Sequence, residues 1–346
     1  MTLIYFIFVL SVTIMVHELG HFLFAKKAGI YVYEFSLGMG PRIFHFKRKN
    51  DETIYAIRLF PIGGFVSMAG EDLESDDAIP ANQQMCNKPW FQRFMTISAG
   101  VLFNFILAIV LLFVVALIHG TPATKPYIDT LDSTYPIADT QITSGDLIVK
   151  INDNKIRSMD RLLLELQVHT GETLLITVKH ENGEIETVSV NPVLTEEDGV
   201  KGYRYGFTLQ NETESGFLAS IRYAFAKTGS LVEQMGLIIG YLFTGKLSLD
   251  NLAGPVGIFN IVGETAKAGF INLLYLIAYL CINVGFINFI PLPAFDGGRL
   301  LFLVIEKIKG SRISPKVENM VHSVGFILLM ILMVFITYHD IIRLFQ

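Results

Sequence analysis

Four apolar runs dominate this 346-residue sequence, and each is about as long as the stretch of roughly 20 residues that a transmembrane helix needs. They cover Thr2–Ala25, Phe94–Ile118, Asn272–Ile290 and Val321–Tyr338. Charged residues make up only 17% of the chain, whereas soluble domains contain about 25%. The sequence therefore predicts a mainly α-helical polytopic membrane protein with about four transmembrane helices.

Positive charges near the ends of these runs predict the orientation. No Lys or Arg precedes Lys26, which argues against a secretory signal peptide, since such a peptide has a positive start. Lys26 and Lys27 follow the first run, and five Lys or Arg residues lie between 299 and 316. We therefore expect residues 26–93 and 299–320 to face the cytoplasm, and both termini to face outside.

Two folded insertions are expected between the runs. In the first, Arg42–Arg48 and Thr53–Leu59 are predicted strands around a turn at Asn50–Glu52, with glycines and prolines marking the strand ends. The strands are apolar, so the hairpin is either an ordinary surface hairpin or one that lies against the membrane. In the second, a strand (Leu147–Asn152), a helix (Ser158–Val168) and a hairpin around Asn182-Gly183 predict a small α+β domain.

The expected organisation follows the chain. The parts are a first span (1–25), a cytoplasmic-side loop with a membrane-associated β-hairpin (26–93), a second span (94–119), an outer α+β domain (120–212), an amphipathic connecting segment (213–270), a third span with a broken end (271–298), a cytoplasmic loop (299–320), and a fourth span with the C-terminus (321–346). The connecting segment either packs on the outer domain or lies on the membrane surface, and the sequence does not decide between these.

The first span contains the motif His17-Glu18-Leu19-Gly20-His21, an HExxH pattern. Residues four apart lie on one face of a helix, so the two imidazoles can bind one zinc ion while Glu18 activates a water molecule. Composition alone produces this pattern in about one chain of this length in a hundred. A pair of solvated histidines is the alternative, but a charged side chain within a span costs about 2.5–3.5 kcal/mol and usually has a function.

Catalytic zinc usually has three protein ligands, and Asp296 is the candidate for the third. Pro291 and Pro293 precede it and cannot continue a helix, while Gly297 and Gly298 are expected to allow tight turns. Broken backbone at membrane depth is tolerated where protein or a wet cavity satisfies it, so we expect the third span to unwind beside the metal. The alternative is that Asp296 only ends a helix at the cytoplasmic surface.

Two other residues compete with Asp296 for this role, namely Glu306, in an interfacial helical stretch, and His322, at the start of the fourth span. Neither a disulfide framework nor a thiol metal site is indicated, because the two cysteines, Cys86 and Cys281, are far apart and form no CxxC pair. The net charge of −5 gives no basic surface for nucleic acid.

These motifs together resemble those of the bacterial site-2 proteases, the RseP-like group of intramembrane zinc metalloproteases that regulate sigma factors. The matching segments are His17–His21, Pro61–Gly70, Ala99–Asn104, Gly254–Ile258 and Asn288–Gly297. The resemblance implies Zn²⁺ as cofactor, Asp296 as the third ligand and Asn288 in substrate binding. We assign Asn104, Pro291 and Pro293 to substrate binding as well. It also implies that the hairpin at Arg42–Leu59 receives the substrate strand.

The outer domain resembles the PDZ domain that these proteases carry between their second and third spans. Gly145–Asn152 matches the most recognisable strand of that domain, but Asp153 stands where the family usually has Gly. The domain is therefore expected either to bind peptide termini or to act as a size filter on substrates.

The function implied by this resemblance is hydrolysis of peptide bonds within the transmembrane segments of single-span proteins. The expected partners are a membrane-bound anti-sigma factor or a remnant signal peptide, together with the lipid bilayer. The expected location is the bacterial cytoplasmic (inner) membrane, with the active site toward the cytoplasm and the PDZ-like domain outside. Two alternatives from other classes are a membrane metal transporter that uses the same His and Asp cluster and a PDZ-bearing membrane scaffold.

Overall fold

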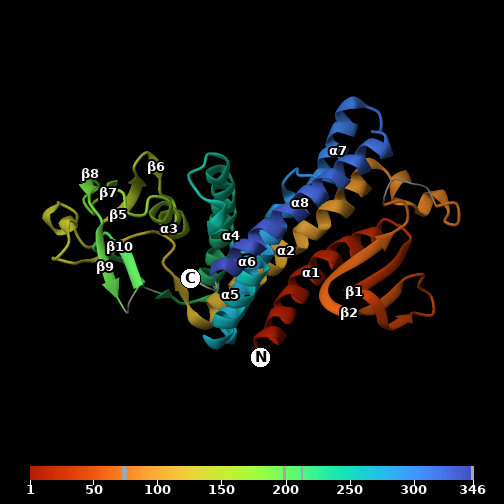
Figure 1. Ribbon diagram of the computed structural model, residues 1–346, viewed down its shortest axis with the longest axis horizontal. Coiled ribbons are helices and arrows are strands. Elements are labelled where there is room, and N and C mark those ends of the chain that lie inside the picture. Colours follow the sequence, from red (N-terminus) through yellow and green to blue (C-terminus); the bar gives the residue numbers. More distant parts are fainter. Residues whose placement is uncertain (72–75, 198–199, 212, 344–346) are drawn as a thin grey trace. The chain divides into compact units, whose positions relative to one another are not determined.

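The computed structural model describes residues 1–71, 76–197, 200–211 and 213–343, so the last three residues of the predicted C-terminal segment lie outside it. The chain forms two compact units. The first contains residues 1–111 and 249–346, and the second contains residues 112–248. Figure 1 shows their helices and strands.

Four helices of the described residues are long and apolar enough to cross a membrane, and they coincide with the four predicted runs. They are α1 (Thr2–Lys27), α2 (Trp90–His119), α6 (Phe270–Phe289) and α8 (Pro315–Arg343). Their length and apolar composition suit the hydrocarbon core of a bilayer. The protein is an integral membrane protein.

The segment predicted as a cytoplasmic loop between the third and fourth spans is mostly helical. Helix α7 runs from Asp296 to Lys309 and ends at Gly310, which adopts a left-handed conformation. Two polar contacts hold α7 against the start of α2. Trp90 Nε1 donates to the carbonyl of Leu303 at 2.7 Å, and Arg93 pairs with Glu306 at 2.9 Å. The sequence analysis expected a helical stretch around Glu306 but not a helix that begins at Asp296, because the glycines after Asp296 were interpreted as turns.

A short helix, α5 (Pro255–Lys267), precedes the third span, and its first turn is capped by Asp340 near the end of α8. The backbone amides of Gly254 and Gly257 donate to the Asp340 carboxylate at 3.2 and 2.8 Å. A Cβ atom on Gly254 would lie 2.7 Å from that carboxylate. This explains why the sequence has glycine at the start of the Gly254–Ile258 motif, because the carboxylate must approach the exposed amides of a helix start.

The predicted hairpin is much longer than expected and curls on itself. Its strands are β1 (Val32–Lys47) and β2 (Ile54–Met68), so the glycines and prolines predicted at strand ends lie within strands. Residues 34–37 pair on one side with 64–67 and on the other with 54–57. The sheet therefore has four segments in the order 64–68, 32–37, 54–57 and 44–47, and Figure 1 shows it beside α1.

The two edges of this sheet differ in character. Edge 44–47 and its surroundings expose large apolar side chains, and edge 64–68 faces the first helix. The exposed apolar residues are Met39, Ile43, Phe44, Phe46, Ile57, Leu59 and Phe60. Large exposed apolar patches are typical of membrane or protein contacts. Within the sheet, buried Glu34 pairs with Arg42 of the same strand and with Arg58 of β2, and the second ion pair connects the two long strands.

The second unit contains the small α+β domain. Its sheet has the order β6 (Asn154–Lys155), β5 (Leu147–Ile151), β7 (Leu174–Lys179) and β8 (Ile185–Val190), and helix α3 (Met159–Val168) is capped by the Ser158 hydroxyl. The strands are β3 (Thr121–Pro122), β4 (Ile128–Leu131), β5 (Leu147–Ile151), β6 (Asn154–Lys155), β7 (Leu174–Lys179), β8 (Ile185–Val190), β9 (Val193–Glu197), β10 (Val200–Arg204), β11 (Phe207–Leu209) and β12 (Thr213–Glu214). The predicted strand, helix and Asn182-Gly183 hairpin are confirmed. Its core is formed by fully buried aliphatic residues such as Ile148, Leu162 and Ile176.

Helix α4 (Phe217–Phe243) packs against α3 of the same unit, which answers the question that the sequence left open for much of the connecting segment. Lys227 Nζ lies 2.6 Å from Asp160, and the Ser230 hydroxyl donates to the same carboxylate at 2.6 Å. Contacts of this kind at the start of α3 fix α4 on the domain, while several apolar residues of α4 remain exposed.

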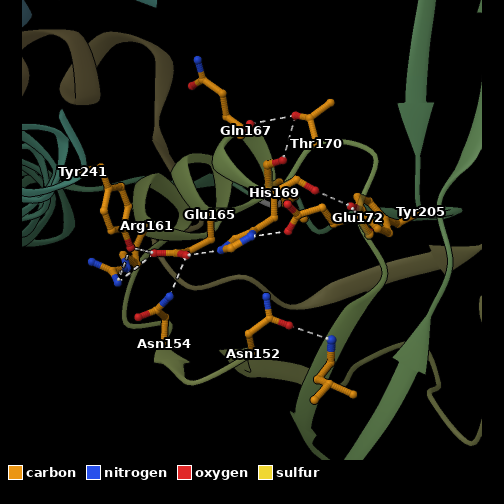
Figure 2. Close-up of polar contacts among 12 residues, drawn as sticks. Asn152, Asn154, Arg161, Glu165, Gln167, His169, Thr170, Glu172, Tyr205 and Tyr241 are labelled. Atoms are coloured by element: carbon orange, nitrogen blue, oxygen red, sulfur yellow. Dashed lines mark hydrogen bonds and ion pairs between the residues drawn. The ribbon is translucent and has the colours of Figure 1, made fainter. Parts of the chain in front are cut away.

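A second link between α3 and α4 is centred on Glu165, which is fully buried (Figure 2). Its carboxylate lies 2.8 Å from Arg161, and it accepts hydrogen bonds from the Tyr241 hydroxyl at 2.5 Å and from the Asn154 amide at 3.0 Å. Burial, followed by the hydrogen bond to Glu165, raises the pKa of Tyr241 to about 12, so its hydroxyl remains a donor. Removal of one charge from this group leaves the other buried without compensation.

We therefore expect Glu165→Gln to destabilise the small domain by about 3–5 kcal/mol, because Arg161 would keep a buried positive charge. Hydrogen exchange of the α3 amides in the full chain measures the effect. Glu172→Gln is the matched control, since Glu172 hydrogen-bonds His169 but has a side chain that is 63% exposed. Equal protection of the α3 amides in both variants would contradict the importance of the buried pair.

The same domain should lose stability as pH rises through the pKa of His180. Its Nδ1 lies 2.8 Å from buried Asp146 and its Nε2 lies 3.2 Å from Glu186. The hydrogen bond to Asp146, with Glu186 as a further cause, raises the pKa of His180 above 6.5. A raised folded-state pKa stabilises at low pH, and that stability disappears as pH passes above it. Protection factors of the β5 and β7 amides should therefore fall as the pH rises above about 6.5 in the wild type and change less in His180→Gln.

Candidate metal centre

The two histidines of the HExxH motif lie on one face of α1, as the four-residue spacing predicts. Both are buried. His21 Nδ1 lies 2.9 Å from the carbonyl oxygen of Thr96 on α2. Since a carbonyl can only accept, His21 donates through Nδ1, and its Nε2 keeps a lone pair that is free to bind a metal. A metal-binding histidine is usually held in this way.

Asp296 reaches the same place from a distant part of the sequence. Helix α6 ends at Phe289, and Pro291 and Pro293 follow in irregular backbone before α7 begins at Asp296. Gly297 and Gly298 do not form the tight turns that we expected, because both lie in the first turn of α7. Glycine is needed at both positions for another reason. A Cβ atom at either position would collide with a main-chain carbonyl, that of Ile290 or of Leu292.

Three ligand atoms meet at this point. His17 Nε2 and His21 Nε2 are 3.1 Å apart, and the Asp296 Oδ2 atom lies 3.0 Å from the first and 3.2 Å from the second. A tetrahedral zinc ion with bonds of about 2.0–2.1 Å holds its ligand atoms about 3.3 Å from one another. The observed triangle has nearly this size, and its donor set of two imidazoles and one carboxylate suits zinc. These residues therefore fit a catalytic zinc site.

Helix α2 forms the back of this triangle, and it approaches closely because it has glycine there. A Cβ atom on Gly100 would lie 2.8 Å from His17 Nε2 and would collide with His21 Nε2. A Cβ atom on Gly20 of α1 would in turn collide with the carbonyl of Ala99. The sequence analysis did not single out Gly100, although it is part of the Ala99–Asn104 motif. The four-residue spacing between Gly100 and Asn104, which puts both on one face of the helix, could have identified it.

Asn104 does not lie where a substrate residue would be expected. It is fully buried, and its side-chain amide lies 3.4 Å from His17 Nδ1, on the far side of the imidazole from the ligand atoms. Its Oδ1 atom has no hydrogen-bond partner in the described structure. A half-turn of the Asn104 side-chain amide exchanges the positions of its oxygen and its nitrogen, so the carbonyl oxygen can equally face His17 Nδ1. In that orientation His17 Nδ1–H donates to Asn104 and Nε2 keeps the lone pair that a metal needs.

A cavity of about 690 Å³ opens in front of the triangle. It is lined by residues of α1, β2, α6, α7 and α8, and these include Glu18 and Asn288. Glu18 therefore faces the same space as the three ligand atoms. Pro291 and Pro293 are not on the lining of this cavity. Pro293 instead packs against α8, where a Cβ atom on Gly325 would collide with it.

Edge segment 64–68 of the curled sheet forms one wall of the cavity. Phe65, Val66 and Met68 line it, and Glu71 after this segment pairs with Arg299 of α7 at 2.6 Å. A Cβ atom on Gly64 would lie 3.6 Å from Glu18 Cγ. An edge strand that reaches the ligand triangle can add a further strand through its main-chain groups.

The two competing ligand candidates have different surroundings. Glu306 pairs with Arg93 and lies outside the ligand cluster. His322 lines the cavity, but it is not part of the cluster either. Its Nδ1 accepts a hydrogen bond from the amide of Ala294. Among the described residues, only His17, His21 and Asp296 converge closely enough to hold one ion.

Comparisons with known proteins identify the family of this chain. The regulator of sigma-W protease RasP of Bacillus subtilis is 33% identical, over 99% of each chain. A zinc metalloprotease RasP of Bacillus licheniformis is 34% identical, again over 99% of each. Among solved structures, the PDZ domain of an SdrC-like protein from Listeria monocytogenes matches 25% of this chain and 88% of its own, with 26% identity and a TM-score of 0.21. The model of peptidase family M50 matches residues 5–332, and the chain belongs to this family of zinc metalloproteases.

Proposed function

We propose that His17, His21 and Asp296 hold the catalytic zinc and that Glu18 is the general base. The observation that carries this proposal is the triangle of ligand atoms, 3.0–3.2 Å on each side, with Glu18 facing the cavity in front of it. When bound, zinc acidifies water and polarises the carbonyl that is attacked. Glu18 accepts the proton of the attacking water and delivers it to the leaving nitrogen. Asn104 and the Thr96 carbonyl orient the two imidazoles.

Substrate enters as an extended segment rather than a helix. In a helix the peptide groups are bonded to one another and shielded by side chains, so a transmembrane substrate must unwind before water can reach its carbonyl groups. Edge segment 64–68 offers main-chain groups to such a segment along the wall of the cavity. Asn288, on the last turn of α6, offers a side-chain amide to the same segment. Pro291 and Pro293 act indirectly, because they break the backbone that places Asp296.

The substrates are single-span membrane proteins. The relative from B. subtilis is a regulator of sigma-W, which supports a membrane-bound anti-sigma factor as one substrate of this chain, and a remnant signal peptide presents the same chemistry. The chain lies in a bacterial cytoplasmic membrane with its metal-centre end toward the cytoplasm. The positive charges of Lys26, Lys27 and the cluster at 299–316 support this orientation. The exposed apolar edge of the curled sheet rests in the membrane.

The small domain acts as a PDZ domain on the outer side, and one observation favours peptide binding over a pure size filter. A cleft of about 530 Å³ lies between α3 and residues 203–209, with Leu163 and Leu166 on its helical side. PDZ domains bind extended peptides by adding a strand beside such a cleft. A peptide terminus produced by an earlier cleavage outside the membrane fits this space.

Purified full-length protein in lipid vesicles, incubated with a single-span reporter protein, tests the proposed activity. Mass spectrometry should locate the cut within the transmembrane segment, and 1,10-phenanthroline should abolish it. A reporter whose span carries Leu in place of Gly and Pro should be cleaved more slowly, because its helix resists unwinding. Cleavage only outside the span, or cleavage that survives the chelator, would contradict the proposal.

A further inference from the structure

His322 of α8 is wedged between residues on both sides of Asp296. The amide of Ala294 donates to His322 Nδ1 at 3.1 Å, and a Cβ atom on Gly298 would lie 3.1 Å from His322 Cε1. The ring of Phe302 is 5.8 Å away, between ring centroids. Ala294 has φ of 78°, a conformation that non-glycine residues rarely adopt. The fourth span therefore supports the strained turn that precedes Asp296 through one imidazole.

The contact with Ala294 decides which nitrogen of His322 carries a proton. A backbone amide can only donate, so Nδ1 accepts and keeps its lone pair. In the neutral imidazole the proton must then be on Nε2. His322 thus presents a hydrogen-bond donor at Nε2, and it has no lone pair there for a metal. This excludes His322 as a zinc ligand through Nε2 while its contact with Ala294 is kept.

This donor is buried and has no acceptor within the described part of the chain. An unpaired buried donor costs about 1–3 kcal/mol, so native proteins rarely keep one without a reason. His322 also lines the 690 Å³ cavity, together with Glu18, Asn288 and Asp296. No described residue thus accepts the hydrogen bond that His322 Nε2–H can donate. An unwound peptide segment supplies acceptors of the right kind, because its carbonyl oxygens have lost their helical partners.

We propose that His322 Nε2–H donates a hydrogen bond to a main-chain carbonyl oxygen of the substrate segment beside Asp296. His322 is then a substrate-contacting residue supplied by the fourth span, in addition to its support of Ala294. The inference rests on the proposed active site, since it assumes that substrate occupies the cavity in front of His17, His21 and Asp296.

Two variants separate the contact with substrate from the contact with Ala294. The side-chain oxygen of His322→Asn can take the place of Nδ1 and accept from Ala294, but nothing remains at the Nε2 position. The amide nitrogen of His322→Gln can take the place of Nε2 and donate to substrate, but the acceptor for Ala294 is lost. We expect kcat/KM for the single-span reporter to fall about 10-fold in His322→Asn, the loss that one hydrogen bond typically produces. His322→Gln should recover part of that loss.

A second measurement does not depend on turnover. In a Glu18→Gln background, capture of the intact reporter by the full-length protein should weaken with His322→Asn and return with His322→Gln, at unchanged zinc content. Unchanged cleavage and capture in His322→Asn would overturn the proposal. Loss of zinc, or equal losses in both variants, would assign His322 a purely structural role and overturn it as well. The proposed function is judged separately, by wild-type cleavage and its loss in Glu18→Gln.

Discussion

Replacement of Glu18 by glutamine is expected to lower cleavage of a single-span reporter by about 10²–10⁴-fold, the usual contribution of a general acid or base. Glutamine has nearly the same shape, but it cannot accept the proton of the attacking water. Glu18 lines the cavity and is not one of the three clustered ligand residues. Zinc content should therefore stay at the wild-type level.

Zinc analysis and cleavage must be measured on the same preparation of Glu18→Gln. Lost cleavage with retained zinc separates a protease from the two alternative classes. A metal transporter would need the ligands but no base, and a scaffold would tolerate the change entirely. Equal cleavage rates in Glu18→Gln and wild type would remove Glu18 from the mechanism.

Replacement of Gly100 by alanine should be nearly as severe, although it adds only one methyl group. The new Cβ atom would lie 2.8 Å from His17 Nε2 and closer still to His21 Nε2, so it would displace both imidazoles and disturb the ligand triangle. Loss of a residue that merely orients a metal ligand typically costs 10–100-fold in affinity or activity, and we expect a zinc affinity loss above about 100-fold here.

Gly229→Ala provides the matched control for this change, because Gly229 is also a helical glycine but has open space where a Cβ atom would be placed. It should keep zinc and activity and become slightly more stable, since alanine favours a helix by about 1 kcal/mol over glycine. Wild-type zinc binding in Gly100→Ala would contradict the close approach of α2 to the two histidines.

The transmembrane helices and the His17–His21 pair could be predicted because each follows from a local rule. An apolar run of about 20 residues predicts a span, and a four-residue spacing places two imidazoles on one helix face. Asp296 lies 275 residues after His21 in the sequence, so no periodicity connects them. It was found because two prolines predict a broken helix beside it and because the surrounding motif resembles that of a known family.

The hairpin shows where local rules fail. Gly38, Gly40 and Pro61 were interpreted as ends of strands, yet they lie within β1 and β2. Two long strands that curl and pair twice need residues that relieve strain and create bulges, and Gly38 and Gly40 both have φ of 86°. Whether a glycine ends or bends a strand depends on tertiary pairing, which one sequence does not contain.

Gly297 and Gly298 show a second limit. Both were expected to permit turns, but they are small because main-chain carbonyls lie against them. Asn104 and His322 show a third limit, because the groups that they contact belong to distant parts of the chain. Asn104 was assigned to substrate, yet it lies behind His17. The role of His322 becomes visible only through the amide of Ala294. Sequence identifies the residue types that carry chemistry, whereas packing decides what each one contacts.

The most direct test of the metal centre is X-ray absorption at the zinc edge, measured on the wild type and on Asp296→Cys. Wild-type zinc should show only nitrogen and oxygen ligands at about 2.0–2.1 Å, because neither Cys86 nor Cys281 belongs to the ligand cluster. In Asp296→Cys one sulfur ligand should appear at about 2.3 Å. Zinc that remains bound in this variant with no sulfur neighbour would contradict the assignment of Asp296 as the third ligand.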